Sequence, residues 1–252
     1  MEGSERQLLL IERMRTAERV TVAELAEETG CSEMTIRRDL DQLAEQGVLR
    51  RVRGGAVSLV LRGEVLPFGV REHEAPESKR RIAAVFDTLV TDGESLILDG
   101  GTTSLAIARA LARRRVTVVP LDLHAAYVLG NAPDVRLLVP GGQTTPGALT
   151  LGGHLTETSL RTLRVDTTVL GVCGLSVDHG LTANDLTEVP IKQAAIASAQ
   201  RVVAVCTGTK FGRTGLGHVC PATDLDMVIT DESAPIEAVS GLRDLGVDVR
   251  VV

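Results

Sequence analysis

Hydrophobic residues follow two different patterns along the chain, and the change comes near residue 76. Before it, apolar residues recur at helical spacing in short stretches, which predicts three helices, at 4–16, 21–30 and 33–46. After it, short apolar runs alternate with amphipathic stretches, which is typical of a mostly parallel sheet with helices on both faces. The sequence therefore predicts a small helical domain followed by a larger α/β domain.

The second and third predicted helices form a close pair with local start and stop signals. Thr21 and Glu24 have the spacing of a capping box, Gly30 supplies the left-handed residue that ends a helix, and Ser32 can cap the next one. In the helix that follows, apolar residues at i, i+4 and i+7 define one buried face: Ile36, Leu40 and Leu43. The pair therefore predicts a helix-turn-helix.

The opposite face of the third helix carries polar side chains, as a recognition helix in the major groove does. Gly47 ends this helix, and the arginine-rich stretch 49–55 predicts a tight hairpin, the wing, beside the phosphate backbone. The residues expected to contact duplex DNA are Ser32, Met34, Thr35, Arg37, Arg38, Gln42, Arg50, Arg51 and Arg53. An ordinary helical hairpin with a solvated charged face is the alternative.

The charge of this region does not decide between the two interpretations. Residues 1–62 hold ten arginines and eleven acidic residues, a net charge of −1, whereas a DNA-binding domain is usually strongly basic. Any attraction to DNA must therefore come from the local arginine cluster. The whole chain has a net charge of −6, which argues against non-specific binding to nucleic acid by the larger domain.

Composition excludes several other classes of protein. No apolar run reaches 18 residues and the N-terminus is charged from Glu2 onward, so we expect no membrane segment or secretory signal. The four cysteines show no CxxC spacing, which favours reduced thiols in a cytoplasmic protein without a metal site or other cofactor. Aromatic residues make up 2% of the chain and Trp is absent, which disfavours stacking on single-stranded bases.

The larger domain is expected to bind a ligand where its strands end. A Gly- and Thr-rich loop at 99–104 follows the predicted strand 95–98 and leads into a helix, an arrangement that suits an anion. It matches neither a P-loop nor a dinucleotide-binding turn. A tight capped turn is the alternative. The residues expected to bind the effector are Asp99, Gly100, Gly101, Thr102, Thr103, Asp122, Gly141, Gly142, Glu188, Lys192 and Lys210.

Two of these assignments have simpler explanations. Glu188 and Lys192 stand at i and i+4, and this spacing alone favours an ordinary surface ion pair. Lys210 follows a small-residue loop and suits a phosphate or a sugar hydroxyl, but a solvated loop lysine is as good an interpretation. Lysine is nevertheless scarce: 24 of the 27 basic residues are arginine, and the lysines are Lys79, Lys192 and Lys210.

The stretch SEMTIRRDLDQLAEQGVLRRVRGGA resembles the N-terminal signature of the DeoR family of bacterial transcription regulators. The resemblance continues through LDGGTTS, GLT, the Glu188–Lys192 pair, KFG and ITD, so it covers essentially the whole chain, and all three lysines fall in matching segments. It implies an effector domain with a fold like that of ribose-5-phosphate isomerase, which commonly senses phosphorylated sugars or similar metabolites.

The chain departs from the family pattern at two places near the expected pocket. Pro120, Leu121 and Asp122 stand where the family usually has a Thr-Asn pair, and 207–210 reads TGTK where the family usually has Asp-Ser-Ser-Lys. A carboxylate at Asp122 would repel a phosphate, which keeps a free polyol open as the effector.

The sequence therefore predicts a sequence-specific transcription regulator and repressor of sugar or related carbon metabolism genes. The expected organisation is a winged helix-turn-helix at 1–57, a linker with a short strand at 58–75, and an effector-sensing and oligomerisation domain at 76–252. Its expected partners are double-stranded operator DNA, a phosphorylated sugar or polyol, and further copies of the chain in a dimer or tetramer, without a membrane. A phosphosugar isomerase-type enzyme with an N-terminal DNA-targeting module is the alternative.

Overall fold

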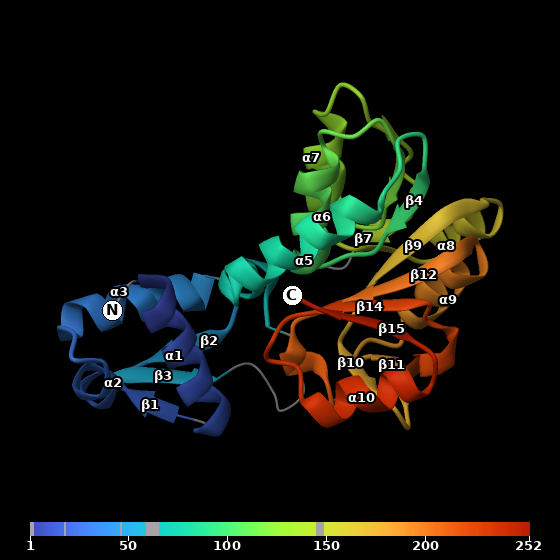
Figure 1. Cartoon of the computed structure of the whole chain (residues 1–252). Helices are drawn as coiled ribbons and strands as arrows, with labels where there is room; N and C mark the ends of the chain where they lie inside the picture. Colours follow the sequence, from blue (N-terminus) through green and yellow to red (C-terminus); the bar gives the residue numbers. More distant parts are fainter. Residues whose placement is uncertain (1–2, 18, 46, 59–65, 145–148) are drawn as a thin grey trace. The chain divides into compact units, whose positions relative to one another are not determined.

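The computed structural model describes residues 3–17, 19–45, 47–58, 66–144 and 149–252. The chain divides into two compact units, an N-terminal unit of residues 1–74 and a C-terminal unit of residues 75–252 (Figure 1). Each unit has a hydrophobic core of its own.

The N-terminal unit is a winged helix-turn-helix. Its three strands form an antiparallel sheet in the order β1-β3-β2, and β2 and β3 are the two strands of the predicted wing. Strand β1 was not predicted, because three residues are too few to show an alternating pattern. The elements are α1 (Gly3–Thr16), β1 (Arg19–Thr21), α2 (Val22–Thr29), α3 (Glu33–Glu45), β2 (Leu49–Val52), β3 (Gly55–Ser58) and α4 (Phe68–His73).

Helix α4 lies where the sequence predicted a linker with a short strand. The sequence of this segment showed little pattern because Pro67, Gly69 and charged residues interrupt its apolar residues, but Pro67 is followed by a helical turn. Leu66 and Val70 are buried in the core of the N-terminal unit, so this part of the segment packs as a structured element. The remainder of the predicted linker, residues 59–65, falls outside the described residues.

The C-terminal unit is built on a seven-stranded sheet in the order β15-β14-β12-β9-β4-β5-β6, in which every neighbouring pair is parallel. This confirms the predicted α/β architecture. The helices are α5 (Pro76–Leu89), α6 (Thr102–Leu111), α7 (Leu123–Gly130), α8 (His154–Arg161), α9 (Val189–Ala197) and α10 (Ile236–Asp244). The strands of the sheet are β4 (Ser95–Leu98), β5 (Thr117–Pro120), β6 (Arg136–Leu137), β9 (Val165–Gly171), β12 (Ala199–Val205), β14 (Met227–Thr230) and β15 (Asp248–Val251).

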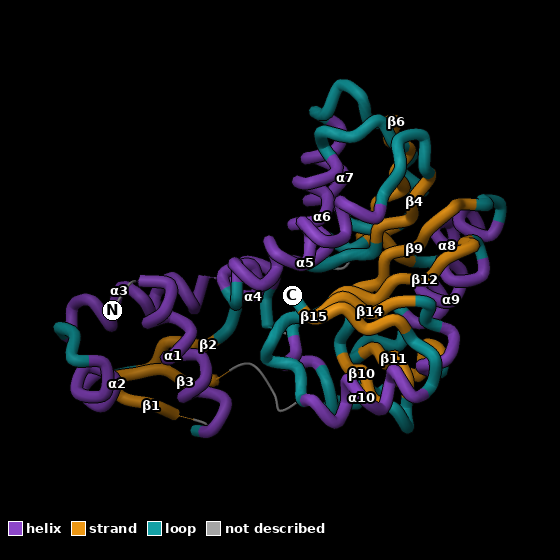
Figure 2. The backbone as a smooth tube through the Cα atoms, in the orientation of Figure 1, coloured by secondary structure: helices purple, strands orange, loops and turns teal. Residues whose placement is uncertain are grey.

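Both faces of this sheet are buried, because successive side chains of a strand point to opposite faces. Leu96 and Leu98 of β4 pack in the core formed with α5, α6 and α7, whereas Ile97 packs in the core formed with α8 and α9. The second face is completed by α10 and by a small antiparallel sheet of β10 (Gly174–Ser176), β11 (Gly180–Ala183) and β13 (Gly217–Cys220) (Figures 1 and 2). The described remainder includes the hairpin β7 (Gln143–Thr144) and β8 (Leu151–Gly152) and two 3-10 turns, at Gly208–Lys210 and Ala222–Asp224.

Two sequence predictions for this unit were wrong in detail. The stretch 174–182, predicted as a loop, is the hairpin β10–β11, whose strands are too short and too rich in small residues to show a strand pattern. The helix predicted at 188–200 ends at Ala197, and β12 starts at Ala199 instead of Val202. The first residues of β12 include Gln200 and Arg201, so they lack the apolar character of a buried strand.

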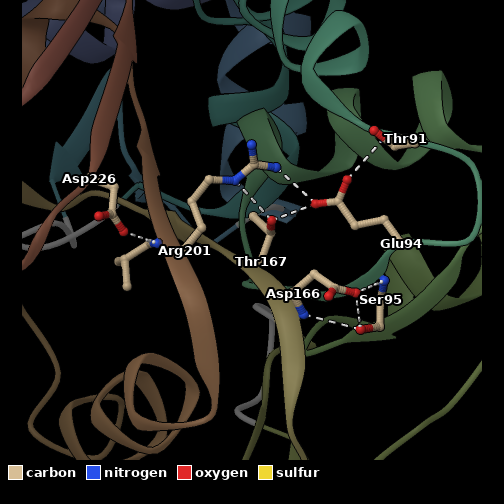
Figure 3. A network of polar contacts seen from close by, with 8 residues as sticks. Thr91, Glu94, Ser95, Asp166, Thr167, Arg201 and Asp226 are labelled. Carbon is tan, nitrogen blue, oxygen red and sulfur yellow. Dashed lines mark hydrogen bonds and ion pairs between the residues drawn. The ribbon is translucent and has the colours of Figure 1, made fainter.

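A polar network joins the amino-terminal ends of β4, β9 and β12 (Figure 3). Glu94 accepts hydrogen bonds from Thr167 (2.6 Å) and from Arg201 (2.8 Å), and Arg201 also donates to the Thr167 hydroxyl. Beside it, the Asp166 carboxylate accepts hydrogen bonds from the backbone N–H and hydroxyl of Ser95, which lower the pKa of Asp166. The network fixes these strands at the edge opposite the predicted ligand loops.

Candidate functional site

The starts of α2 and α3 and the turn between these helices carry the local signals that the sequence showed. The Thr21 hydroxyl accepts a hydrogen bond from the Glu24 backbone N–H (3.2 Å), and the Glu24 carboxylate accepts one from the Thr21 N–H (2.8 Å). Gly30 ends α2 in the left-handed conformation (φ 67°), and the Ser32 hydroxyl accepts a hydrogen bond from the Thr35 N–H. The starts of α2 and α3 are therefore fixed by side-chain caps on their backbone N–H groups.

Replacing Thr21 with alanine is expected to destabilise the N-terminal unit by about 1 kcal/mol, because the Glu24 N–H loses its cap. Urea unfolding followed by circular dichroism measures the effect. Glu24→Gln keeps an acceptor for the Thr21 N–H and serves as the control, with a smaller expected loss. Equal stability of Thr21→Ala and the native chain would contradict the role of the cap.

Helix α3 has one fully buried face and one exposed face. Ile36, Leu40 and Leu43 are completely buried, as predicted. On the other side, Met34 is 73% exposed, and Arg38 and Gln42 are also exposed. An ion pair between Arg6 of α1 and the buried Asp39 of α3 holds the helix in place; sequence reasoning missed it because the two residues stand 33 positions apart.

The predicted DNA-contacting residues differ in their surroundings. Arg37 pairs with Glu33 (2.6 Å), and Arg51 pairs with Asp41 (2.8 Å) and donates to the Gly55 carbonyl. The Gln42 side chain accepts a hydrogen bond from Gln7, and the hydroxyls of Ser32 and Thr35 bond to each other. By contrast, no residue that the structure describes makes an ion pair or side-chain hydrogen bond with Arg38, Arg50 or Arg53. These three guanidinium groups are available to a ligand.

The C-terminal unit has an open pocket at the carboxyl ends of the sheet strands. Of the predicted effector residues, Asp99, Glu188 and Lys192 line it, although they come from distant parts of the sequence. Sequence reasoning missed its other lining residues, which belong to no motif that the sequence analysis singled out. These are Thr150, Leu151, Gly152, Thr187 and Ile191.

A buried ion pair between Lys192 and Asp99 lies at the base of this pocket. The Lys192 ammonium also donates to the Gly171 carbonyl (3.1 Å), and Asp99 accepts a hydrogen bond from the Gly171 N–H (2.8 Å). Burial alone would lower the pKa of Lys192, but the carboxylates of Asp99 and Glu188 raise it above its ordinary value. The lysine is therefore charged and joins α9 to the ends of β4 and β9.

The glycine loop after β4 is tightly packed. A side chain at Gly100 would approach the Thr150 hydroxyl to 2.9 Å, so Thr150 itself explains the need for glycine there. Gly101 has φ 114° and ψ 171°, a conformation that is essentially restricted to glycine. It precedes Thr102 and Thr103 in the first turn of α6, a helix that no described side chain caps.

Asp122 caps helix α7 beside this loop. One of its carboxylate oxygens accepts hydrogen bonds from the backbone N–H groups of His124 (2.7 Å) and Ala125 (3.2 Å). The other oxygen is buried and has no hydrogen-bond partner among the described residues. Burial raises the pKa of Asp122 against the opposing effect of these hydrogen bonds and of His124. A backbone bridge to Thr150 connects Asp122 to the pocket wall.

The remaining predicted residues do not line the pocket. Gly141 and Gly142 pack against α8, where the Thr156 hydroxyl donates to the Gly141 carbonyl (2.7 Å). Lys210 ends the 3-10 turn after β12, a loop held to the end of β14 by Asp231, which accepts a hydrogen bond from the Gly208 N–H (2.9 Å). Hydrogen bonds from Ser233 and Gly208 lower the pKa of Asp231 although burial opposes them.

In the described ranges, no helix combines the length and apolar character that crossing a membrane requires. The same ranges contain no group of three or more His, Cys, Asp or Glu side chains arranged to hold a metal ion.

Comparisons with solved structures and curated proteins extend this picture. Ribose 5-phosphate isomerase A from Methanocaldococcus jannaschii is 16% identical and has a TM-score of 0.40 over 54% of each chain. A putative aga operon transcriptional repressor of Escherichia coli O157:H7 is 32% identical over 99% of this chain and 94% of its own length. The glycerol-3-phosphate regulon repressor of Escherichia coli K12 is 31% identical over 97% of both chains, and the regulator GolR of Listeria innocua is 30% identical over 98% of both.

Two family profiles together cover nearly the whole chain. The DeoR-like helix-turn-helix domain matches residues 6–60, and the DeoR C terminal sensor domain matches residues 74–232. Both halves thus match domains of DNA-binding regulators, and the isomerase-type enzyme is rejected as an alternative. The chain belongs to the DeoR family of transcription regulators.

Proposed function

We propose that the chain is a repressor whose affinity for operator DNA is controlled by a small sugar-like metabolite in the C-terminal pocket. In this proposal, residues 1–57 bind DNA, residues 76–252 sense the effector and form the oligomer, and residues 58–75 connect them. Two or four copies place winged helices on paired half-sites, as dimeric helix-turn-helix proteins do. The protein acts in the cytoplasm, where bacterial DNA is found.

The observation that carries this proposal is the exposed face of α3. The helix is fixed by three buried side chains and by the Arg6–Asp39 pair, and it presents outward Arg38, which has no partner among the described residues. In the part of the chain that the structure describes, Arg50 and Arg53 of the wing also lack a partner, and they suit contacts with phosphates. An exposed arginine on a rigid helix beside an arginine-bearing hairpin suits sequence-specific binding, although residues 1–62 as a whole are not basic.

The pocket supports a hydroxyl-rich effector. Thr150 and Thr187 offer hydroxyls, and Asp99, Glu188 and Lys192 offer charged hydrogen-bonding groups. Because Lys192 is already paired with Asp99, a phosphate would have to compete for it, whereas a free polyol would not. The relatives named for the aga operon and the glycerol-3-phosphate regulon support control of sugar or related carbon metabolism genes. The proposed effector is therefore a sugar-like polyol, free or phosphorylated.

Two measurements test the proposal in sequence. Selection from a random duplex library is expected to enrich an operator with paired half-sites, whose affinity is then measured by fluorescence anisotropy. The full chain is next screened by thermal shift against matched pairs of free and phosphorylated polyols, and a ligand at 100 times its Kd should stabilise the chain by about 2.7 kcal/mol. The same ligand should change operator affinity by about 5- to 150-fold. Failure to enrich any sequence at low salt would refute the proposal.

Replacing Arg53 with alanine is expected to weaken binding to all duplexes alike, because a phosphate contact is lost. The slope of log K against log salt should fall in magnitude by about 0.9. Anisotropy titrations of operator and scrambled duplex at several salt concentrations measure both slopes. A loss confined to the operator would instead assign Arg53 to a base.

A further inference from the structure

The N-terminal turn of α3 exposes a large apolar side chain. Among the described residues of the N-terminal unit, Met34 and Leu9 are the large hydrophobic side chains that stand exposed, Met34 at 73% and Leu9 at 38%. The three core-facing residues of α3 are completely buried, so the core does not need Met34.

The polar groups around Met34 are already engaged. Glu33 pairs with Arg37, and the hydroxyls of Ser32 and Thr35 bond to each other. Along the exposed face, the next side chain without such a partner within the described ranges is Arg38, one turn further along the helix. The first two turns of α3 therefore offer DNA one apolar group and one free guanidinium, four residues apart.

The major groove has a matching pair of features. The thymine 5-methyl group is its apolar feature, and arginine binds guanine O6 and N7 as the commonest specific contact. Side chains at i and i+4 stand about 5–6 Å apart, against a rise of about 3.4 Å per base pair, so the two contacts fall one or two base pairs apart. Building on the proposed function, we infer that Met34 determines operator specificity by contacting a thymine methyl group one or two base pairs from the guanine bound by Arg38.

Deoxyuridine tests this contact because it lacks only the methyl group. Each thymine of the selected operator is replaced in turn, and Kd is measured for the full-length chain. Replacement of one thymine per half-site is expected to weaken binding roughly fourfold. This is the effect of losing the burial of one methyl group. In Met34→Ala the thymine and deoxyuridine operators should bind equally well.

Two further variants serve as controls. Met34→Leu keeps an apolar side chain of similar volume, so the preference for thymine should persist. Arg53→Ala should weaken both duplexes by the same factor and leave their ratio unchanged. Alanine at position 34 favours the helix and removes no buried contact, and an unchanged melting temperature will show that the unit stays folded.

The outcomes separate the inference from the function on which it rests. An operator that is enriched but insensitive to deoxyuridine overturns the role of Met34 alone. The same holds if Met34→Ala retains the full thymine preference. A chain that enriches no sequence refutes the proposed function and the inference together.

Discussion

Replacing Lys192 with methionine is expected to lower the free energy of unfolding of the C-terminal unit by about 3–5 kcal/mol. The substitution leaves the Asp99 carboxylate, which is 3% exposed, without its counter-charge in a buried site. Methionine fills most of the volume of the lysine stem, so the loss reports the unpaired charge more than a cavity. Urea unfolding followed by circular dichroism measures it, with the transitions of the two units fitted separately.

Two further variants make this result specific. Arg161→Met removes an ion pair on the surface of α8, where Arg161 is 60% exposed, and should cost at most about 1 kcal/mol. Adding Asp99→Asn to Lys192→Met removes the orphaned charge and should recover part of the loss. A cost below about 1 kcal/mol for Lys192→Met would mean that the pair is solvated and is not a structural element of the pocket.

Replacing Arg38 with alanine is expected to weaken operator binding by about 5- to 150-fold, which corresponds to about 1–3 kcal/mol for a lost bidentate base contact. Arg38 is exposed on α3 and has no partner among the described residues, so no internal bond must break before it reaches a base. Anisotropy titrations with operator and with scrambled duplex measure how much more the substitution weakens binding to the operator than to the scrambled duplex.

Arg37→Ala is the matched control for this prediction. Arg37 neighbours Arg38 on the same helix but is paired with Glu33, so its loss should cost less operator affinity. An equal, small weakening of every duplex by Arg37→Ala and Arg38→Ala would contradict the assignment of Arg38 to base recognition.

The recognition helix was predictable because its determinants lie close together in the sequence. The capping box spans residues 21–24, and the buried face of α3 repeats within eight residues. The parallel sheet after residue 76 was also predictable, because each strand and each helix shows its pattern within a short stretch of sequence. Short elements such as β1 and β10 carry too few residues to show a period.

The pocket was only partly predictable because its contacts join distant positions. The spacing of Glu188 and Lys192 favoured an ordinary surface pair, but Lys192 is buried and bonds Asp99, 93 residues away. The glycine at position 100 indicated that another part of the chain lies close to the loop. The sequence did not show that this part is Thr150. Asp122 was expected among the effector-binding residues, as a carboxylate that would repel a phosphate, whereas one of its oxygens caps α7. Sequence spacing carries no information about such partners.

The outer strands of the seven-stranded sheet bear on how the protein behaves at high concentration. An unpaired strand edge is a template for aggregation unless it is short or charged. One outer strand, β6, has two residues, and the other, β15, carries Asp248 and Arg250. Neither edge offers a long apolar surface to a neighbouring chain, so the protein should not form fibres by strand-to-strand association in concentrated solution.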